Sequence, residues 1–90
     1  MENNSVQNWS SQLEYQSIDL KFGNAVKSLR KKEIISQENL AHLAKIDRTH
    51  MGRIERGNVS PSLKTMNQIA LALDVKLGHL LSNQQQQDPG

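Results

Sequence analysis

Apolar residues recur at spacings of three and four along most of this chain, which is the pattern of amphipathic α-helices. The first such stretch follows Ser17, whose hydroxyl group can cap a helix, and it is expected to end near Glu33 or Ile34. Its apolar positions are Ile18, Phe22, Ala25, Val26 and Leu29. The spacing therefore predicts one amphipathic helix between these limits.

Two shorter helical patterns come next, with about three residues between them. Ser36 can cap the first and Asp47 the second, and Gly57 is well placed to end the second. Their expected apolar positions are Leu40, Leu43, Ala44, Met51 and Ile54. Two helices joined by so short a turn form a helix-turn-helix candidate.

The last part of the predicted domain carries two more helical patterns. Residues 58–61 have the composition of a loop, Ser62 can cap a fourth helix that ends at Asp74, and a short fifth helix follows. The apolar positions are Leu63, Met66, Ile69, Ala70 and Leu73 on the fourth helix, and Val75, Leu77, Leu80 and Leu81 on the fifth. The sequence thus predicts an all-α fold, a compact five-helix domain in which helices two and three form the helix-turn-helix.

Both ends of the chain differ from this middle part. Residues 1–16 are rich in Asn, Gln and Ser and are expected to form a mobile leader. Because Trp9 and Leu13 are four residues apart, a short helix that docks on the domain or on a partner is the alternative. Residues 83–90 form a polar tail that is expected to be disordered. The expected domain therefore covers residues 17–82.

The composition limits the classes of protein to which this chain can belong. Ninety residues, 36% of them hydrophobic, suit one small domain, and with one Trp, one Tyr and one Phe its core must be mostly aliphatic. The absence of cysteine excludes disulfides and thiolate chemistry and, with no signal pattern at the N-terminus, fits a cytoplasmic protein. No apolar run approaches the ~20 residues of a membrane span.

Nothing in the sequence points to catalysis. The three histidines lack the spacing of metal ligands, and no Gly-rich phosphate-binding loop is present. We therefore expect no metal, no cofactor and no catalytic residue, and the chain is not predicted to be an enzyme.

The charge is distributed unevenly along the chain. The net charge is only +2, but all 11 Lys and Arg residues lie between Lys21 and Lys76. Residues 17–82 contain these 11 basic residues and 6 acidic ones, which gives a net charge of +5. Such an excess is compatible with binding to a phosphate backbone, although a solvated Lys-rich face has the same composition.

An ordered set of short motifs runs through residues 22–81. Its segments are Leu29-Arg30, Ser36-Gln37, Leu40-Ala41, Asp47-Arg48-Thr49, Arg53-Ile54-Glu55-Arg56-Gly57, Pro61-Ser62-Leu63 and Ala70-Leu71-Ala72-Leu73. The set resembles the helix-turn-helix family of small phage repressors and Cro proteins and, within it, the controller proteins of restriction–modification systems. The family usually has Gly where Ile34 and Lys45 stand. A β-branched residue is costly at φ > 0, so the turn at Ile34 must be made differently or carry strain.

The resemblance also implies roles for three residues outside the exposed face of the third helix. Gln37 is expected to bind a phosphate through its side chain and the helix N-terminus, and to brace the recognition helix. Arg30 and Glu55 are expected to form a partly buried ion pair between the first and third helices. This pair would be structural and would read no bases.

A recognition helix enters the major groove with its first residues leading, so the residues expected to face DNA are Arg48, Thr49, Gly52 and Arg53. Arg48 can pair with guanine and Thr49 can meet a thymine methyl group, whereas Arg53 can reach a base or a phosphate. A solvated helix surface is the alternative for both arginines. Gly52 is explained either by close approach of the helix backbone to DNA or by drift. Further candidates for phosphate contact are His50, which alternatively faces solvent, and the loop and cap residues Asn58, Ser60 and Ser62.

Two functions are compatible with these features. The first is a sequence-specific transcription regulator that binds double-stranded DNA as a homodimer on a two-fold-related operator, because one recognition helix covers too little sequence. The dimer interface is expected on the outer face of the fourth helix and at Val75, Leu77, Leu80 and Leu81, unless these residues only close the core. The second is an antitoxin that binds its own operator and uses residues 1–16 on a toxin. Controller-like activation would also require contact with RNA polymerase, which no residue identifies.

Overall fold

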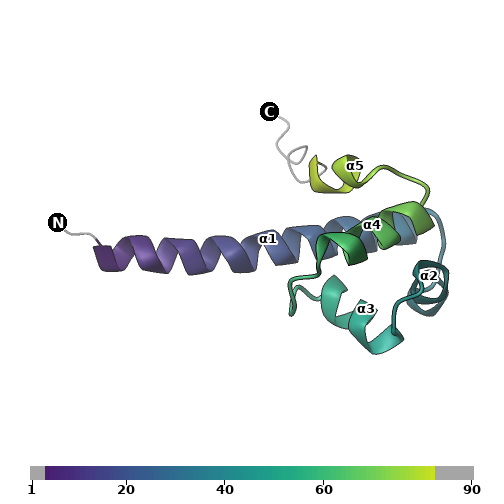
Figure 1. Ribbon diagram of the computed structural model, residues 1–90, viewed down its shortest axis with the longest axis horizontal. Helices are drawn as coiled ribbons and strands as arrows, with labels where there is room; N and C mark the ends of the chain where they lie inside the picture. The colour runs from purple at the N-terminus through teal and green to yellow at the C-terminus, as the bar shows by residue number, and fades with distance from the viewer. Residues whose placement is uncertain (1–3, 83–90) are drawn as a thin grey trace.

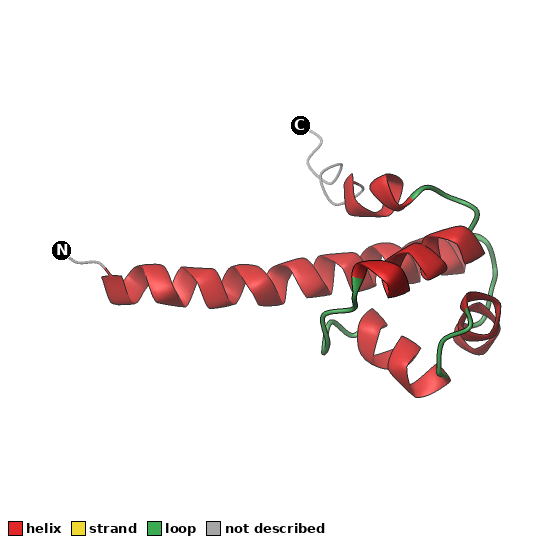
Figure 2. Ribbon diagram, viewed as in Figure 1, coloured by secondary structure: helices red, strands yellow, loops and turns green. Residues whose placement is uncertain are grey.

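The computed structural model describes residues 4–82 and, among these, the side chains of residues 18–82. Five α-helices follow one another along the chain (Figure 1). They are α1 (Asn4–Lys32), α2 (Gln37–Ala44), α3 (Arg48–Glu55), α4 (Leu63–Ala72) and α5 (Leu77–Ser82). Residues 4–82 contain helices and connecting loops but no strand (Figure 2). The predicted all-α fold of five helices is confirmed.

The first helix is longer than the apolar stripe predicts. It contains 29 residues and begins at Asn4, so Ser17 lies inside the helix and does not cap it. Neither Pro nor Gly interrupts the chain before Gly23, which explains why the helix continues through the polar residues. A helix of this length spans about 43 Å, and its N-terminal part extends past the other four helices (Figure 1). The mobility of residues 1–16 stays a prediction, and the expected tail, 83–90, lies outside the described residues.

The other four helices pack around the C-terminal part of α1. That helix contacts α3 and α5, while α4 contacts α2 and α5. In the view of Figure 1, α5 lies on one side of α1 and α4, and the α2–α3 pair lies on the other. None of the described helices is both long and apolar enough to cross a membrane.

The core is mostly aliphatic, as the composition predicts. Its largest fully buried side chains are Leu40, Met51, Ile54, Ile69, Leu80 and Val26, and Phe22 is the aromatic residue among the buried core residues. Three positions assigned to apolar faces are instead exposed, namely Ile18, Leu43 and Leu63. Leu63 is the first residue of α4 and Leu43 lies in the last turn of α2, where a helix face has less of its neighbour to cover it.

Polar side chains begin three of the helices at the predicted positions. Ser36 Oγ accepts a hydrogen bond from the backbone N–H of Asn39 at 3.0 Å. Asp47 Oδ2 accepts from the N–H groups of Thr49 and His50 at 2.9 and 3.2 Å. Ser62 Oγ accepts from the N–H of Thr65 at 3.1 Å. The three predicted caps of α2, α3 and α4 are confirmed.

Four helices end with one hydrogen-bond pattern, the Schellman motif, in which the residue after the cap is left-handed. At the end of α3 this residue is Gly57, with φ 75°, whose N–H donates to Ile54 O at 3.0 Å. The equivalent residues of α1, α2 and α4 are Ile34, Lys45 and Asp74, with φ between 56° and 59°. The predicted alternative of strain at Ile34 is therefore the one observed. An L-residue in this conformation costs about 1–2 kcal/mol.

Candidate nucleic-acid interface

A short connection sets the angle between α2 and α3. The last turn of α2 is held by Gln68 of α4, whose Nε2 donates to Ala44 O at 3.0 Å. Lys45 then turns the chain in its left-handed conformation, and Ile46 packs against the core. Asp47 follows at once and caps α3. The helix-turn-helix is therefore positioned by contacts with α4 as well as by its own turn.

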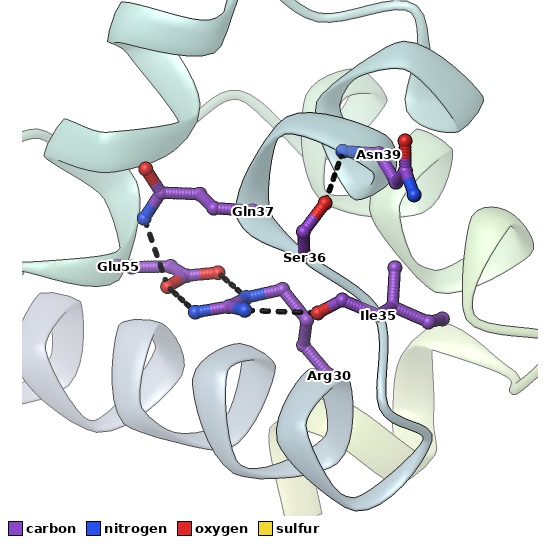
Figure 3. A network of polar contacts seen from close by, with 6 residues as sticks. All are labelled: Arg30, Ile35, Ser36, Gln37, Asn39 and Glu55. Carbon is purple, nitrogen blue, oxygen red and sulfur yellow. Dashed lines mark hydrogen bonds and ion pairs between the residues drawn. The ribbon is translucent and has the colours of Figure 1, made fainter.

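A buried ion pair fixes the inner side of α3 to α1 (Figure 3). Arg30 Nε donates to Glu55 Oε2 at 2.7 Å and Arg30 Nη2 donates to Glu55 Oε1 at 2.9 Å, so the pair is bidentate. The two residues are 9% and 4% exposed. The hydrogen bond to Glu55 raises the pKa of the Arg30 guanidinium although burial opposes it. The pair implied by the resemblance is thus present, and it faces the protein interior.

Two further hydrogen bonds extend this pair to the start of α2. Arg30 Nη1 donates to Ile35 O at 2.9 Å, in the turn between α1 and α2. Gln37 Nε2 donates to Glu55 Oε1 at 3.1 Å, so the first residue of α2 is tied to the last residue of α3 (Figure 3). The carboxylate of Glu55 thereby accepts three hydrogen bonds from two helices. This network holds α1, α2 and α3 in one arrangement.

Glycine allows α1 to approach α3 closely. A Cβ atom added to Gly23 would lie 2.8 Å from the carbonyl oxygen of Glu55, which is closer than real Cβ contacts. Gly57, after α3, likewise lies against the backbone of α1, because an added Cβ would be 2.8 Å from Leu20 Cα. Sequence reasoning missed Gly23, for which the available signal was a glycine inside a helical pattern. These contacts press the C-terminal end of α3 against α1.

The outer face of α3 carries three of the residues predicted to contact DNA. Arg48, Thr49 and Arg53 are exposed, whereas Met51 and Ile54 are buried in the core. His50 is half-buried, with its N–H bound to the cap of the helix. The core therefore fixes which side of α3 is turned outward, and the two arginines with Thr49 lie on that side.

Gly52 does not lie on this outer face, which corrects the prediction that it is exposed. It is buried, and an added Cβ would lie 3.2 Å from Nη1 of Arg56 and 3.4 Å from Oε1 of Gln37. The two side chains that cover it come from the C-terminal cap of α3 and from the start of α2. Sequence reasoning assigned no DNA contact to Arg56. Its spacing of four residues from Gly52, one helical turn, was the available signal.

The predicted loop contacts separate into one exposed residue and two that already have partners. Asn58 is exposed. Ser60 Oγ donates to Asp19 Oδ2 of α1 at 2.6 Å, which ties the loop after α3 to the long helix. Ser62 Oγ caps α4 and donates to Thr65 Oγ1 at 3.1 Å. Asn58 is therefore the member of this set without a hydrogen-bonding role in residues 18–82.

The four residues assigned to a dimer interface are not equivalent. Leu80 is fully buried, so it belongs to the core and cannot contact a second subunit, which corrects that assignment. Val75 and Leu77 are half-buried against the core, and Leu81 is exposed. On α4, Leu63 and Leu71 are exposed. The available apolar surface near the C-terminal end thus consists of α4 and α5 residues other than Leu80.

The described part of the chain brings no three His, Cys, Asp or Glu side chains close enough to hold a metal ion. Its most strongly fixed charged group, the Arg30–Glu55 pair, is closed by hydrogen bonds on all sides. The exposed chemistry on α3 consists of guanidinium and hydroxyl groups, which bind phosphates and the edges of bases.

Known proteins share this arrangement. The helix-turn-helix family model matches residues 26–80. A control protein, C.MunI, from Mycoplasma sp. is 37% identical over 73% of this chain and 90% of its own length. An immunity repressor protein of Bacillus phage phi105 is 31% identical over 69% of this chain, but the match covers 43% of the repressor.

Solved structures give the same result. The restriction-modification controller protein C.AhdI from Aeromonas hydrophila is 39% identical, with a TM-score of 0.68 over 69% of this chain and 94% of the controller. An HTH_3 family transcriptional regulator from Vibrio cholerae is 29% identical, with a TM-score of 0.74 over 81% of this chain and 41% of that protein. This chain therefore belongs to the helix-turn-helix family of DNA-binding transcription regulators.

Proposed function

We propose that this protein is a sequence-specific regulator that binds a two-fold-related operator as a homodimer, with α3 in the major groove. The observation that carries the proposal is the division of α3 into two faces. Its inner face is held by the core and by the Arg30–Glu55 pair, and its outer face presents Arg48, Thr49 and Arg53. A helix fixed on one side and cationic on the other is suited to major-groove readout.

The three outward residues take different roles in this proposal. Arg48, the first residue of α3, pairs with guanine through two hydrogen bonds, and Thr49 contacts a thymine methyl group or a base acceptor. Arg53 lies further along the helix and binds a base or a phosphate. His50, Gln37 and Asn58 contact the phosphate backbone, which positions the helix without reading sequence.

Dimerisation follows from the amount of sequence that one recognition helix can read. A single helix contacts too few base pairs for specific binding, and two subunits on half-sites about one helical turn apart double that number. We place the interface on Leu81, on the accessible parts of Val75 and Leu77, and on the outer face of α4, where Leu71 is exposed. The likeness to control and repressor proteins supports a role at a promoter.

A second candidate is an antitoxin that binds its own operator and holds a toxin through its N-terminal segment. One observation favours it, namely that the N-terminal part of α1 extends past the other helices, where a partner can reach it (Figure 1). Expression together with the neighbouring gene product and co-purification of a small protein would support this candidate.

The experiment that tests the proposal is selection from a pool of random duplexes, with the wild-type protein and Arg48→Ala in parallel. We expect the wild-type protein to enrich a motif with two-fold symmetry, and the variant to lose preference at one base pair in each half-site. Equal weakening of Arg48→Ala on specific and random duplexes would contradict the base contact. No enriched motif for the wild-type protein would contradict specific regulation and favour the antitoxin candidate.

A further inference from the structure

Gly52 is a glycine in the interior of the recognition helix, where glycine is normally unfavourable. The structure gives a reason for it. The Nη1 atom of Arg56 and the Oε1 atom of Gln37 lie 3.2 and 3.4 Å from the position that a Cβ of Gly52 would occupy. A guanidinium group and a carboxamide from two different helices therefore converge on the bare backbone of one residue. A side chain at this position would displace at least one of them.

The place where they converge has positive charge without a matching negative charge. Within residues 18–82 Arg56 forms no salt bridge, and the adjacent carboxylate of Glu55 is already occupied by Arg30 and Gln37. Gln37 is the first residue of α2, so the positive end of that helix lies at the same place. Glu38, in the first turn of α2, makes no ion pair with Arg56. An anion at this position would meet uncompensated cationic groups.

The hydrogen bonds of Gln37 leave it able to donate to such an anion. Its amide nitrogen has two hydrogens and gives one to Glu55 Oε1 at 3.1 Å. That bond fixes the orientation of the amide, with the oxygen turned away from Glu55 (Figure 3). The second hydrogen of the amide nitrogen remains for another acceptor. Gln37 and Arg56 can thus donate to one oxyanion from two sides.

We propose that Arg56 and Gln37 together clamp one phosphate of the DNA backbone, and that Gly52 is present because its missing side chain gives the Arg56 guanidinium its place. The proposal rests on the proposed function, since it assumes that α3 enters the groove beside this clamp. It assigns Arg56 to phosphate contact and so adds a residue to the DNA interface. A phosphate contact carries no sequence information, and its role is to set the register of α3 along the groove.

The test compares Arg56→Ala and Arg56→Lys with the wild-type protein on the selected duplex and on a random duplex of about two helical turns. Each dissociation constant is measured over a series of salt concentrations. We expect Arg56→Ala to bind both duplexes about tenfold more weakly at physiological salt and to lower the salt slope by about 1, because one phosphate contact is lost. Arg56→Lys should keep much of the slope. Lys27→Ala, which removes one charge from an exposed position of α1, is the matched control and should leave the slope unchanged.

Gly52→Ala tests the role of the glycine separately. Alanine is the better helix former, so the melting temperature should not fall, yet the added methyl group should displace Arg56 and reduce both the affinity and the salt slope. A variant that is less stable and keeps the wild-type salt slope would overturn this role.

The outcomes separate the clamp from the proposed function. If the wild-type protein selects a motif but Arg56→Ala keeps its affinity and slope, the clamp is wrong and specific regulation stands. If Arg56→Ala loses affinity only for the selected duplex, Arg56 reads a base and the phosphate assignment is wrong. If no motif is selected but Arg56→Ala lowers the slope on random duplex, the clamp stands without specific regulation.

Discussion

The two faces of α3 are built in opposite ways. On the inner face, Glu55 accepts three hydrogen bonds and is almost fully buried, so its carboxylate has no capacity for a ligand. On the outer face, Arg48 and Arg53 are exposed and form no ion pair with any carboxylate in residues 18–82. The difference teaches that a charged residue in this helix is structural where its partners are complete and available for DNA where they are missing. Residue type alone does not separate the two roles.

Removal of Glu55 should give the largest change in stability. In Glu55→Ala, the buried Arg30 loses both of its hydrogen bonds to the carboxylate, and breaking a buried pair from one side costs about 3–5 kcal/mol. Urea unfolding followed by circular dichroism would measure the loss. The double variant Arg30→Met with Glu55→Met is the control and should recover most of it, since no charge is left unpaired. A loss below about 1 kcal/mol in Glu55→Ala would show that the inner face does not depend on the pair.

A methyl group between α1 and α3 should have the next largest effect. In Gly23→Ala the new Cβ meets backbone oxygen, which cannot turn aside as a side chain can, so we expect a loss of about 1–3 kcal/mol. Gly78→Ala is the matched control, because nothing lies within 4 Å of a Cβ added there. Thermal unfolding of the two variants side by side would check the prediction. Equal melting temperatures would mean that the close approach of α1 to α3 is not needed for the fold.

Arg48→Ala should show the opposite behaviour from Glu55→Ala. The side chain is exposed, so the free energy of unfolding should change by no more than about 0.5 kcal/mol. Discrimination at one base pair should fall by about 1–3 kcal/mol, measured by competition between the selected duplex and single-base variants. If Arg48→Ala instead lowers the stability as much as Gly23→Ala, the outer face is not independent of the fold.

The smallest effect should come from the turn after α1, which belongs to neither face. Ile34 is 90% exposed and left-handed, so Ile34→Gly removes strain and loses little packing. We expect a gain of about 1 kcal/mol after the extra freedom of glycine in the unfolded chain is subtracted. Chemical denaturation would measure it. DNA affinity should be unchanged, and a change in affinity would mean that this turn takes part in binding.

Much of the fold follows from local chemistry that a sequence displays directly. Ser36, Asp47 and Ser62 each start a helix where their side chains can accept backbone hydrogen bonds, and Gly57 ends one with a positive φ. The start of α1 was wrong because helix caps are not the only way to begin a helix, and no breaker separates residues 4–16 from the amphipathic stripe.

The errors in the candidate site arise where burial depends on contacts distant in sequence. Leu80 has the composition of an interface residue, but its full burial depends on how α5 lies against α1 and α4. Gly52 was placed outward by helical spacing alone, yet it is covered by Gln37, a residue of another helix. Arg56 was missed for the same reason, since its position matters only once α2 is beside α3. The Arg30–Glu55 pair came from the family likeness and could not be deduced from spacing.

The four Schellman motifs affect how such chains tolerate mutation. Only one of their left-handed positions is glycine, while the residue after it is apolar and packed on the core at Ile35, Ile46 and Val75. That buried neighbour anchors each turn from within, so the left-handed position can accumulate substitutions at a tolerable cost in stability. In a distant homologue, the apolar residue after the turn is accordingly a more durable marker of where each helix ends than the glycine before it.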